Sequence, residues 1–211
     1  MPTAGHAVLP RLIRRLRSLR PGIELDVEEM LSAQQIHALQ DGAIDVGLTR
    51  PPIRTNRITL AAQMVDPLCL ALPDDHRLAR DRGPIDLRAV ADEPFVSFLR
   101  HRGPAVFDLT IGACTEAGFD PQIRYEGHTF ASVLDLVAAG LGVAIVQASC
   151  GIRPASGYIL RALSRPTPAS SLALAHLTGD ANPIVALLAT LATSVFEELS
   201  VDIRRAIAGV Q

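Results

Sequence analysis

The stretch from Leu9 to Arg50 constrains the fold more than any other part of the chain, because its hydrophobic pattern switches between helical and strand periods. Apolar residues recur at helical spacing from Leu9 onward, and arginines occupy the other face of the predicted helix. Pro10 fits this helix only in the first turn, where its missing N–H costs no hydrogen bond. Pro21 and Gly22 then predict the end of the helix.

The residues that follow predict a strand, a second helix and a second strand. Over residues 23–28, apolar and acidic residues alternate with the period of a half-buried strand. Ser32 and Gln35 form a capping-box pattern, which predicts a helix that ends at Gly42. The apolar run over 43–48 is typical of a buried parallel strand. A helix–strand–helix–strand order with short connections indicates a doubly wound α/β unit.

The rest of the chain continues this alternation of helices and strands. The same patterns predict strands at 60–64, 68–72, 94–98, 123–126, 143–146, 158–163 and 172–177, and helices at 105–118, 129–139 and 182–208.

Composition excludes several classes of protein. All 20 basic residues are arginine, so a Schiff-base lysine and a P-loop lysine are both impossible. The net charge of −2 and the absence of a basic tail disfavour direct binding of nucleic acid by this chain. The chain contains no apolar run of membrane length and no secretory signal, so we expect a cytoplasmic protein without a membrane partner. The three cysteines have no CxxC spacing, which leaves no pattern for a disulfide framework or a zinc site.

No pattern in the sequence indicates catalysis, a metal or a cofactor. Gly140 and Gly142 follow a predicted helix and precede a strand, the reverse of a dinucleotide fingerprint. Residues 148–151 lack the first glycine of a nucleophile elbow. The six histidines show no paired spacing of the kind that metal ligands need. We therefore predict no catalytic residue, no metal ligand and no cofactor.

Five segments in register carry a resemblance to a known family. They are LPRL with RPGIEL and GAIDVGL in the first fifty residues, LALPDDHRLA at 70–79, DEPFVSF at 92–98, AGFDPQI up to 123 and LVAAGLGVAIV at 136–146. Together they resemble the effector-binding domain of LysR-type transcriptional regulators. The resemblance implies an α/β fold of the type 2 periplasmic-binding-protein kind, with two Rossmann-like lobes around a ligand cleft.

The family resemblance also implies an organisation and a set of partners. One lobe is expected from residues 1–66 with 168–211, and the other from 67–167. Family members carry an N-terminal winged helix-turn-helix and a first strand that this chain does not contain, so DNA is expected as a partner only through that domain. A small-molecule effector and self-association to a dimer or tetramer are the other partners that the resemblance implies.

Polar residues after predicted strands supply the candidate effector site, because open α/β sheets bind ligands beyond the carboxyl ends of their strands. The family's first turn adds Thr3, and Phe98 lies next to a strand-end serine. The candidates are Thr3, Ser32, Thr49, Arg50, Ser97, Phe98, Arg100, His128, Thr129 and Gln147. Arg50 is the sharpest of them, because it ends a buried strand and offers a fork of donors to an anion. A structural carboxylate is the alternative partner for its guanidinium.

The predicted function is effector sensing for a LysR-type regulator, in which a small, anionic metabolite changes the packing of an oligomer. A solute-binding protein of the same fold is the alternative, and the lack of a secretory signal disfavours it. An enzyme on this fold is the third possibility, and the lack of an acid–base or nucleophile constellation disfavours it.

Overall fold

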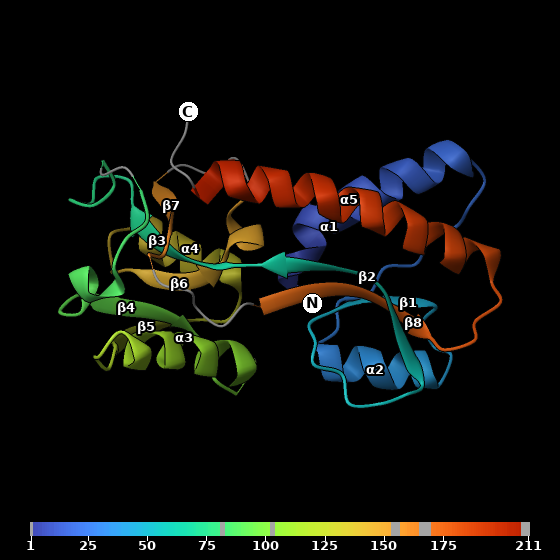
Figure 1. Ribbon diagram of the computed structural model, residues 1–211, viewed down its shortest axis with the longest axis horizontal. Coiled ribbons are helices and arrows are strands. Elements are labelled where there is room, and N and C mark those ends of the chain that lie inside the picture. The colour runs from blue at the N-terminus through green and yellow to red at the C-terminus, as the bar shows by residue number, and fades with distance from the viewer. Residues whose placement is uncertain (1, 81–82, 102–103, 153–156, 165–169, 208–211) are drawn as a thin grey trace. The chain divides into compact units, whose positions relative to one another are not determined.

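The computed structural model describes residues 2–80, 83–101, 104–152, 157–164 and 170–207, without the side chains of residues 2–6, 105 and 151. The chain divides into two compact units (Figure 1). Unit 1 contains Met1–Asp66 and Ser170–Val201, and unit 2 contains Pro67–Ala169 and Asp202–Gln211. Each unit combines helices with an open sheet. The predicted lobe boundaries, 1–66 with 168–211 and 67–167, stay a prediction.

Unit 1 is built on a three-stranded antiparallel sheet in the order β1-β8-β2. The strands are β1 (Val46–Thr49), β8 (Ser170–Leu177) and β2 (Ile58–Asp66). Figure 1 shows α2 (Ser32–Gln40) on one face of this sheet, and α1 (Pro2–Leu19) and α5 (Pro183–Ile207) on the other. The prediction of a parallel strand near 43–48 was wrong in its direction, since β1 pairs with β8 in antiparallel register. A short apolar run indicates burial on both faces, and the direction of a strand depends on partners far away in the sequence.

The predicted strand over 23–28 is absent, because these residues form no strand ladder in the part of the chain that the structure describes. Leu25 and Val27, which should lie on its buried face, are 41% and 52% exposed. Alternation predicts a strand only when another strand lies beside it and a core covers one face. Among the described residues, no strand lies beside residues 23–28 and no core covers one of their faces.

Helix α1 starts earlier than the sequence pattern predicts. It begins at Pro2, so Pro10 lies inside the helix and not in its first turn, and the prediction for Pro10 was wrong. The helix buries Val8, Leu12 and Leu16 at its helical spacing. Burial of these three side chains stabilises α1, although Pro10 removes one backbone hydrogen bond inside the helix.

Helices α1 and α5 are joined by polar contacts. Arg15 of α1 donates hydrogen bonds to Ser194 Oγ at 2.7 Å and to Glu198 in α5. One stripe of α5 is buried and contains Val185, Ala192, Val195, Phe196 and Leu199. By length and composition alone, α5 could cross a membrane.

Unit 2 contains a second three-stranded sheet and a parallel strand pair. The order β6-β3-β7 is antiparallel, while β4 and β5 are parallel, and a bridge from Phe95 to Val143 joins the two sets. The strands are β3 (Leu68–Pro73), β4 (Pro94–Phe98), β5 (Gln122–Gly127), β6 (Ala144–Gln147) and β7 (Tyr158–Ala162). The α-helices are α3 (Pro104–Glu116) and α4 (Phe130–Ala138), and the short 3-10 helices are η1 (Leu87–Val90) and η2 (Ala148–Gly151). The hydrophobic core of unit 2 contains Leu70, Leu72, Val90, Phe95 and Cys114.

Candidate functional site

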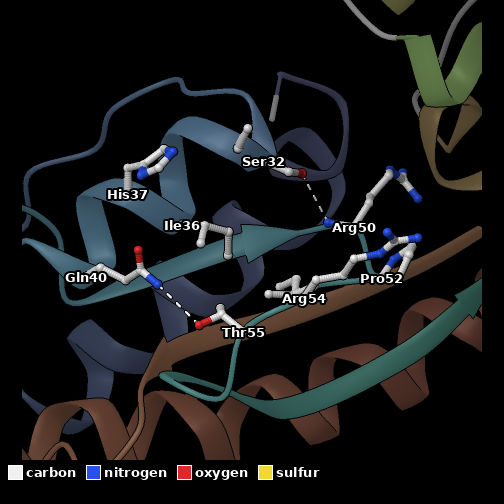
Figure 2. Close-up of a pocket in the computed structure, with 10 residues that line it drawn as sticks. Ser32, Ile36, His37, Gln40, Arg50, Pro52, Arg54 and Thr55 are labelled. Carbon is white, nitrogen blue, oxygen red and sulfur yellow. Dashed lines mark hydrogen bonds between the residues drawn. The ribbon is translucent and has the colours of Figure 1, made fainter.

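A pocket of about 410 Å³ lies in unit 1, between α2 and the segment that follows β1. Figure 2 shows its lining, which comes from one face of α2 and from residues 50–55. The lining residues are Ser32, Ala33, Ile36, His37, Gln40, Arg50, Pro52, Ile53, Arg54 and Thr55. Two of them, Ser32 and Arg50, are among the predicted site residues, and the structure brings these two together.

Ser32 stands at the start of α2 and bonds to the end of β1. Its Oγ accepts the backbone N–H of Arg50 at 3.2 Å (Figure 2). The capping box predicted for Ser32 and Gln35 was wrong by one residue. Leu31 occupies the N-cap position, and Gln34 accepts the Leu31 N–H at 2.9 Å. Ser32 therefore does not cap the helix, and its hydroxyl instead links the start of α2 to the residue that follows β1.

The Arg50 guanidinium is held by side chains of unit 1. Its Nη2 lies 2.7 Å from Asp66 Oδ2, and its Nη1 donates to Ser170 Oγ at 2.9 Å. The Arg50 side chain is 9% exposed and Asp66 is fully buried. A buried ion pair with a hydrogen-bonded guanidinium is the structural alternative that the sequence left open for Arg50. The role of Arg50 in binding an anion stays a prediction.

The remaining pocket residues form an apolar floor with a polar rim. Ile36 and Ile53 pack against the buried cluster of Leu39, Ile58 and Ala175. Gln40 donates to Thr55 Oγ1 at 3.4 Å, which ties the end of α2 to the loop (Figure 2). A floor of this kind suits an apolar body, while the rim suits polar groups.

The lining contains basic side chains and no acidic one. Arg50, Arg54 and His37 line the pocket, and Arg50 is already paired with Asp66 behind it. The first turn of α2 adds backbone N–H groups at Ser32 and Ala33, at the positive end of the helix. A pocket with this lining favours an anion over a neutral or cationic molecule.

Thr49 is buried but is not a lining residue of this pocket. Its Oγ1 has no hydrogen-bond partner among the residues that the structure describes. Gly47 lies on the same face of β1, and a Cβ there would come within 2.7 Å of Gln35 Oε1. This face of β1 therefore lies directly under α2.

The predicted residues of β4 and the following turn lie in unit 2. Ser97 is buried, and its hydroxyl donates to the Phe98 carbonyl at 3.4 Å. The Phe98 ring stacks on Phe130 at a centroid distance of 5.1 Å. Arg100 is 67% exposed, pairs with Asp108 at 3.3 Å and covers the ring of Phe107. Each of these residues has a local structural role, and their contact with an effector stays a prediction.

The other predicted residues of unit 2 surround the start of α4 and the end of β6. Thr129 is the N-cap of α4, where its Oγ1 accepts the Ser132 N–H at 3.0 Å, and His128 beside it is exposed. Gln147 is fully buried, and its Oε1 accepts a weak hydrogen bond from Cys150 Sγ. Its Nε2 has no hydrogen-bond partner in the described part of the chain. The side chain of Thr3 lies outside the described residues.

Several pocket residues were missed by reasoning from the sequence. They are Ala33, Ile36, His37, Gln40, Pro52, Ile53, Arg54 and Thr55. Ser32, Ile36 and Gln40 are spaced four residues apart, so one face of the predicted helix carried a signal for three of the lining positions. The loop residues carried no comparable pattern.

Comparison with known proteins decides the family. The sequence model described as "LysR substrate binding domain" matches residues 1–197. The chain belongs to this family. A LysR relative, the HTH-type transcriptional regulator CatR of Pseudomonas putida, is 31% identical over 190 residues, which cover 90% of this chain and 65% of CatR. The regulator AlsR of Bacillus subtilis is 30% identical over 147 residues, which cover 70% of this chain and 48% of AlsR. The chain thus spans about half to two thirds of these relatives.

Solved structures agree on the LysR fold. The effector-binding domain of BenM, solved with its effector benzoate, has a TM-score of 0.76 at 22% identity, over 92% of this chain and 87% of that one. The C-terminal domain of a probable LysR regulator from Rhodococcus has a TM-score of 0.75 at 20% identity, over 91% and 95% of the two chains. The predicted α/β class, of the type 2 periplasmic-binding-protein kind, is confirmed. The matches do not favour the solute-binding alternative.

Proposed function

We propose that this LysR domain senses a small anionic metabolite for a longer transcriptional regulator, and that the α2 pocket of unit 1 contributes to the binding of that effector. The lining of this pocket is the observation that carries the proposal, because it combines basic side chains with an apolar floor and lacks acidic residues. Its volume of about 410 Å³ suits a small molecule. The structural relative BenM has benzoate, a small carboxylate, as its effector.

The proposed domain acts by binding and not by catalysis. DNA is contacted only by a helix-turn-helix elsewhere in the longer protein, as the HTH-type relatives lead us to expect. The effector changes how copies of the protein pack into a dimer or tetramer in the cytoplasm. It does so only to the extent that it binds one arrangement more tightly than the other. The candidate residues of unit 2, which are Ser97, Phe98, Arg100, His128, Thr129 and Gln147, belong to the same proposal.

A thermal-shift experiment with matched ligands tests the anionic character of the effector. Benzoate and hexanoate are compared with benzamide and hexanamide, which keep the apolar body and remove the charge. A ligand at 100 times its dissociation constant adds about 2.7 kcal/mol to the free energy of unfolding. We expect at least one carboxylate to raise the melting temperature with saturation, and its amide to do less. Equal effects of acid and amide would contradict the proposal.

A further inference from the structure

The pocket of unit 1 contains two arginines whose surroundings differ. Arg50 is 9% exposed and has Asp66 and Ser170 as partners. Arg54 is exposed, and in the described parts of the chain no hydrogen bond or ion pair engages its side chain. The two guanidinium groups are therefore not equivalent for a ligand, although both line the pocket.

The Arg50 guanidinium is a poor choice for the effector's anionic group. Its Nη1 and Nη2 already donate to Ser170 and Asp66, so a ligand carboxylate that approached these two atoms would have to displace the fully buried Asp66 or share Nη2 with it. A carboxylate that loses its charged partner inside the protein is strongly unfavourable. The neutralised Arg50 also attracts an anion less strongly than an unpaired arginine does.

The backbone around Arg54 is held on both sides. Ile53 packs against the cluster that contains Leu39 and Ile58, and Thr55 accepts the hydrogen bond from Gln40. Figure 2 shows the Arg54 side chain extending from the Thr55 end of the pocket toward the Arg50 end. Binding therefore requires ordering of the side chain but not of the loop, and this lowers the entropic cost.

The Ser32 hydroxyl can supply a second polar contact at the same end of the pocket. Its Oγ accepts the Arg50 N–H, so its own hydrogen remains available to donate. A carboxylate can accept from a guanidinium and a hydroxyl at once. The apolar side chains of Ile36, Pro52 and Ile53 lie beside these donors.

We propose that Arg54, and not Arg50, binds the anionic group of the effector, and that Ile36, Pro52 and Ile53 hold an apolar body. This inference rests on the proposed function and names the ligand class as a small carboxylate with one apolar face. It also makes Arg54, a loop residue, the group that selects carboxylates over neutral ligands. Arg50 then keeps a structural role beside the site.

Calorimetric titration of the 211-residue chain with benzoate, hexanoate and the two matched amides tests the assignment. Arg54→Ala is expected to weaken carboxylate binding by about tenfold to a hundredfold, because a charge-assisted hydrogen bond is lost. Binding of the amides should change by less than about twofold, since the charge contributes little to it. Arg54→Lys should recover only part of the affinity, because lysine lacks the planar fork.

Arg57→Ala is the charge-matched control. Arg57 is exposed, lies three residues away and does not line the pocket, and its Nη2 donates to the Gln40 carbonyl at 3.3 Å. It should leave carboxylate binding within about twofold of the parent, because a solvent-exposed charge outside the pocket is screened. An equal loss in Arg54→Ala and Arg57→Ala would overturn the assignment in favour of the general charge of the loop. Unchanged binding in Arg54→Ala would also overturn it, while the anionic proposal would survive. If the parent binds neither carboxylate, the proposed function fails first and the role of Arg54 with it.

Discussion

Arg50 Nη2 lies 2.7 Å from Asp66 Oδ2, and the Arg50 guanidinium joins the ends of three strands. Arg50 follows β1, Asp66 is the last residue of β2, and Ser170, which accepts from Arg50 Nη1, is the first residue of β8. Asp66 and Ser170 are also register partners in the β2–β8 ladder. One guanidinium therefore fixes the end of the unit 1 sheet.

Replacement of Arg50 is predicted to destabilise the fold. Arg50→Ala leaves the buried Asp66 carboxylate without its charged partner, which should lower the free energy of unfolding by about 3–5 kcal/mol. Urea denaturation followed by circular dichroism measures this loss. The double variant Arg50→Met with Asp66→Leu should be more stable than Arg50→Ala, because it removes the buried charge as well. Arg54→Ala is the control and should change stability by less than about 0.5 kcal/mol.

Thr129 is predicted to contribute to stability through helix capping. Thr129→Ala removes the acceptor for the Ser132 N–H and should cost about 1 kcal/mol in the free energy of unfolding. Thr129→Ser keeps a hydroxyl at the N-cap and should retain most of the stability. Urea denaturation of the two variants measures the difference. Equal losses of stability in Thr129→Ala and Thr129→Ser would contradict the capping role.

Cys114 is predicted to be unreactive at neutral pH. Burial, together with the charge of Asp120, raises the pKa of its thiol from 9.0 to about 12. The thiolate is the nucleophile, so iodoacetamide at pH 7.5 should modify Cys114 only in the unfolded chain. Mass spectrometry of native and urea-treated protein measures the difference. Rapid labelling of Cys114 in the native protein would contradict its burial.

The same pKa shift predicts a loss of stability in alkali. Below pH 9 the thiol is protonated in both the folded and the unfolded chain, so the pH has no effect through this group. Between pH 9 and 12 the unfolded chain loses this proton while the folded chain keeps it, so stability falls as the pH rises. The loss is about 1.4 kcal/mol at pH 10. Unfolding of Cys114→Ala at pH 8 and pH 10 should show a decrease smaller than the parent's by that amount.

The sequence predicted the elements that carry their own periodic pattern. The apolar spacing in α4 and the short apolar run in β4 both identify elements in the structure, because each element is buried close to its own residues. Residues 23–28 show the limit of this reasoning. Their alternation is as clear as that of any strand, but no strand of the described chain lies beside them to cover Leu25 and Val27.

The candidate site was only partly predictable for a related reason. Ser32 and Arg50 were found because they follow an element boundary, where open sheets gather polar groups. The partner of Arg50, Asp66, lies sixteen residues away on another strand, and only the sheet register brings the two together. Arg54 sits in a loop without periodicity, so nothing in its sequence context distinguishes it from the exposed Arg57.

A small anion is proposed to bind in the pocket between α2 and residues 50–55. Titration of the isotopically labelled chain with benzoate, followed by backbone amide NMR shifts, tests it directly. Saturable shifts are expected at Ala33, Ile36, Arg54 and Thr55, with much smaller shifts for benzamide. The contrary result is a saturable carboxylate response that leaves residues 32–40 and 50–55 unshifted, which would place the anion elsewhere in the domain.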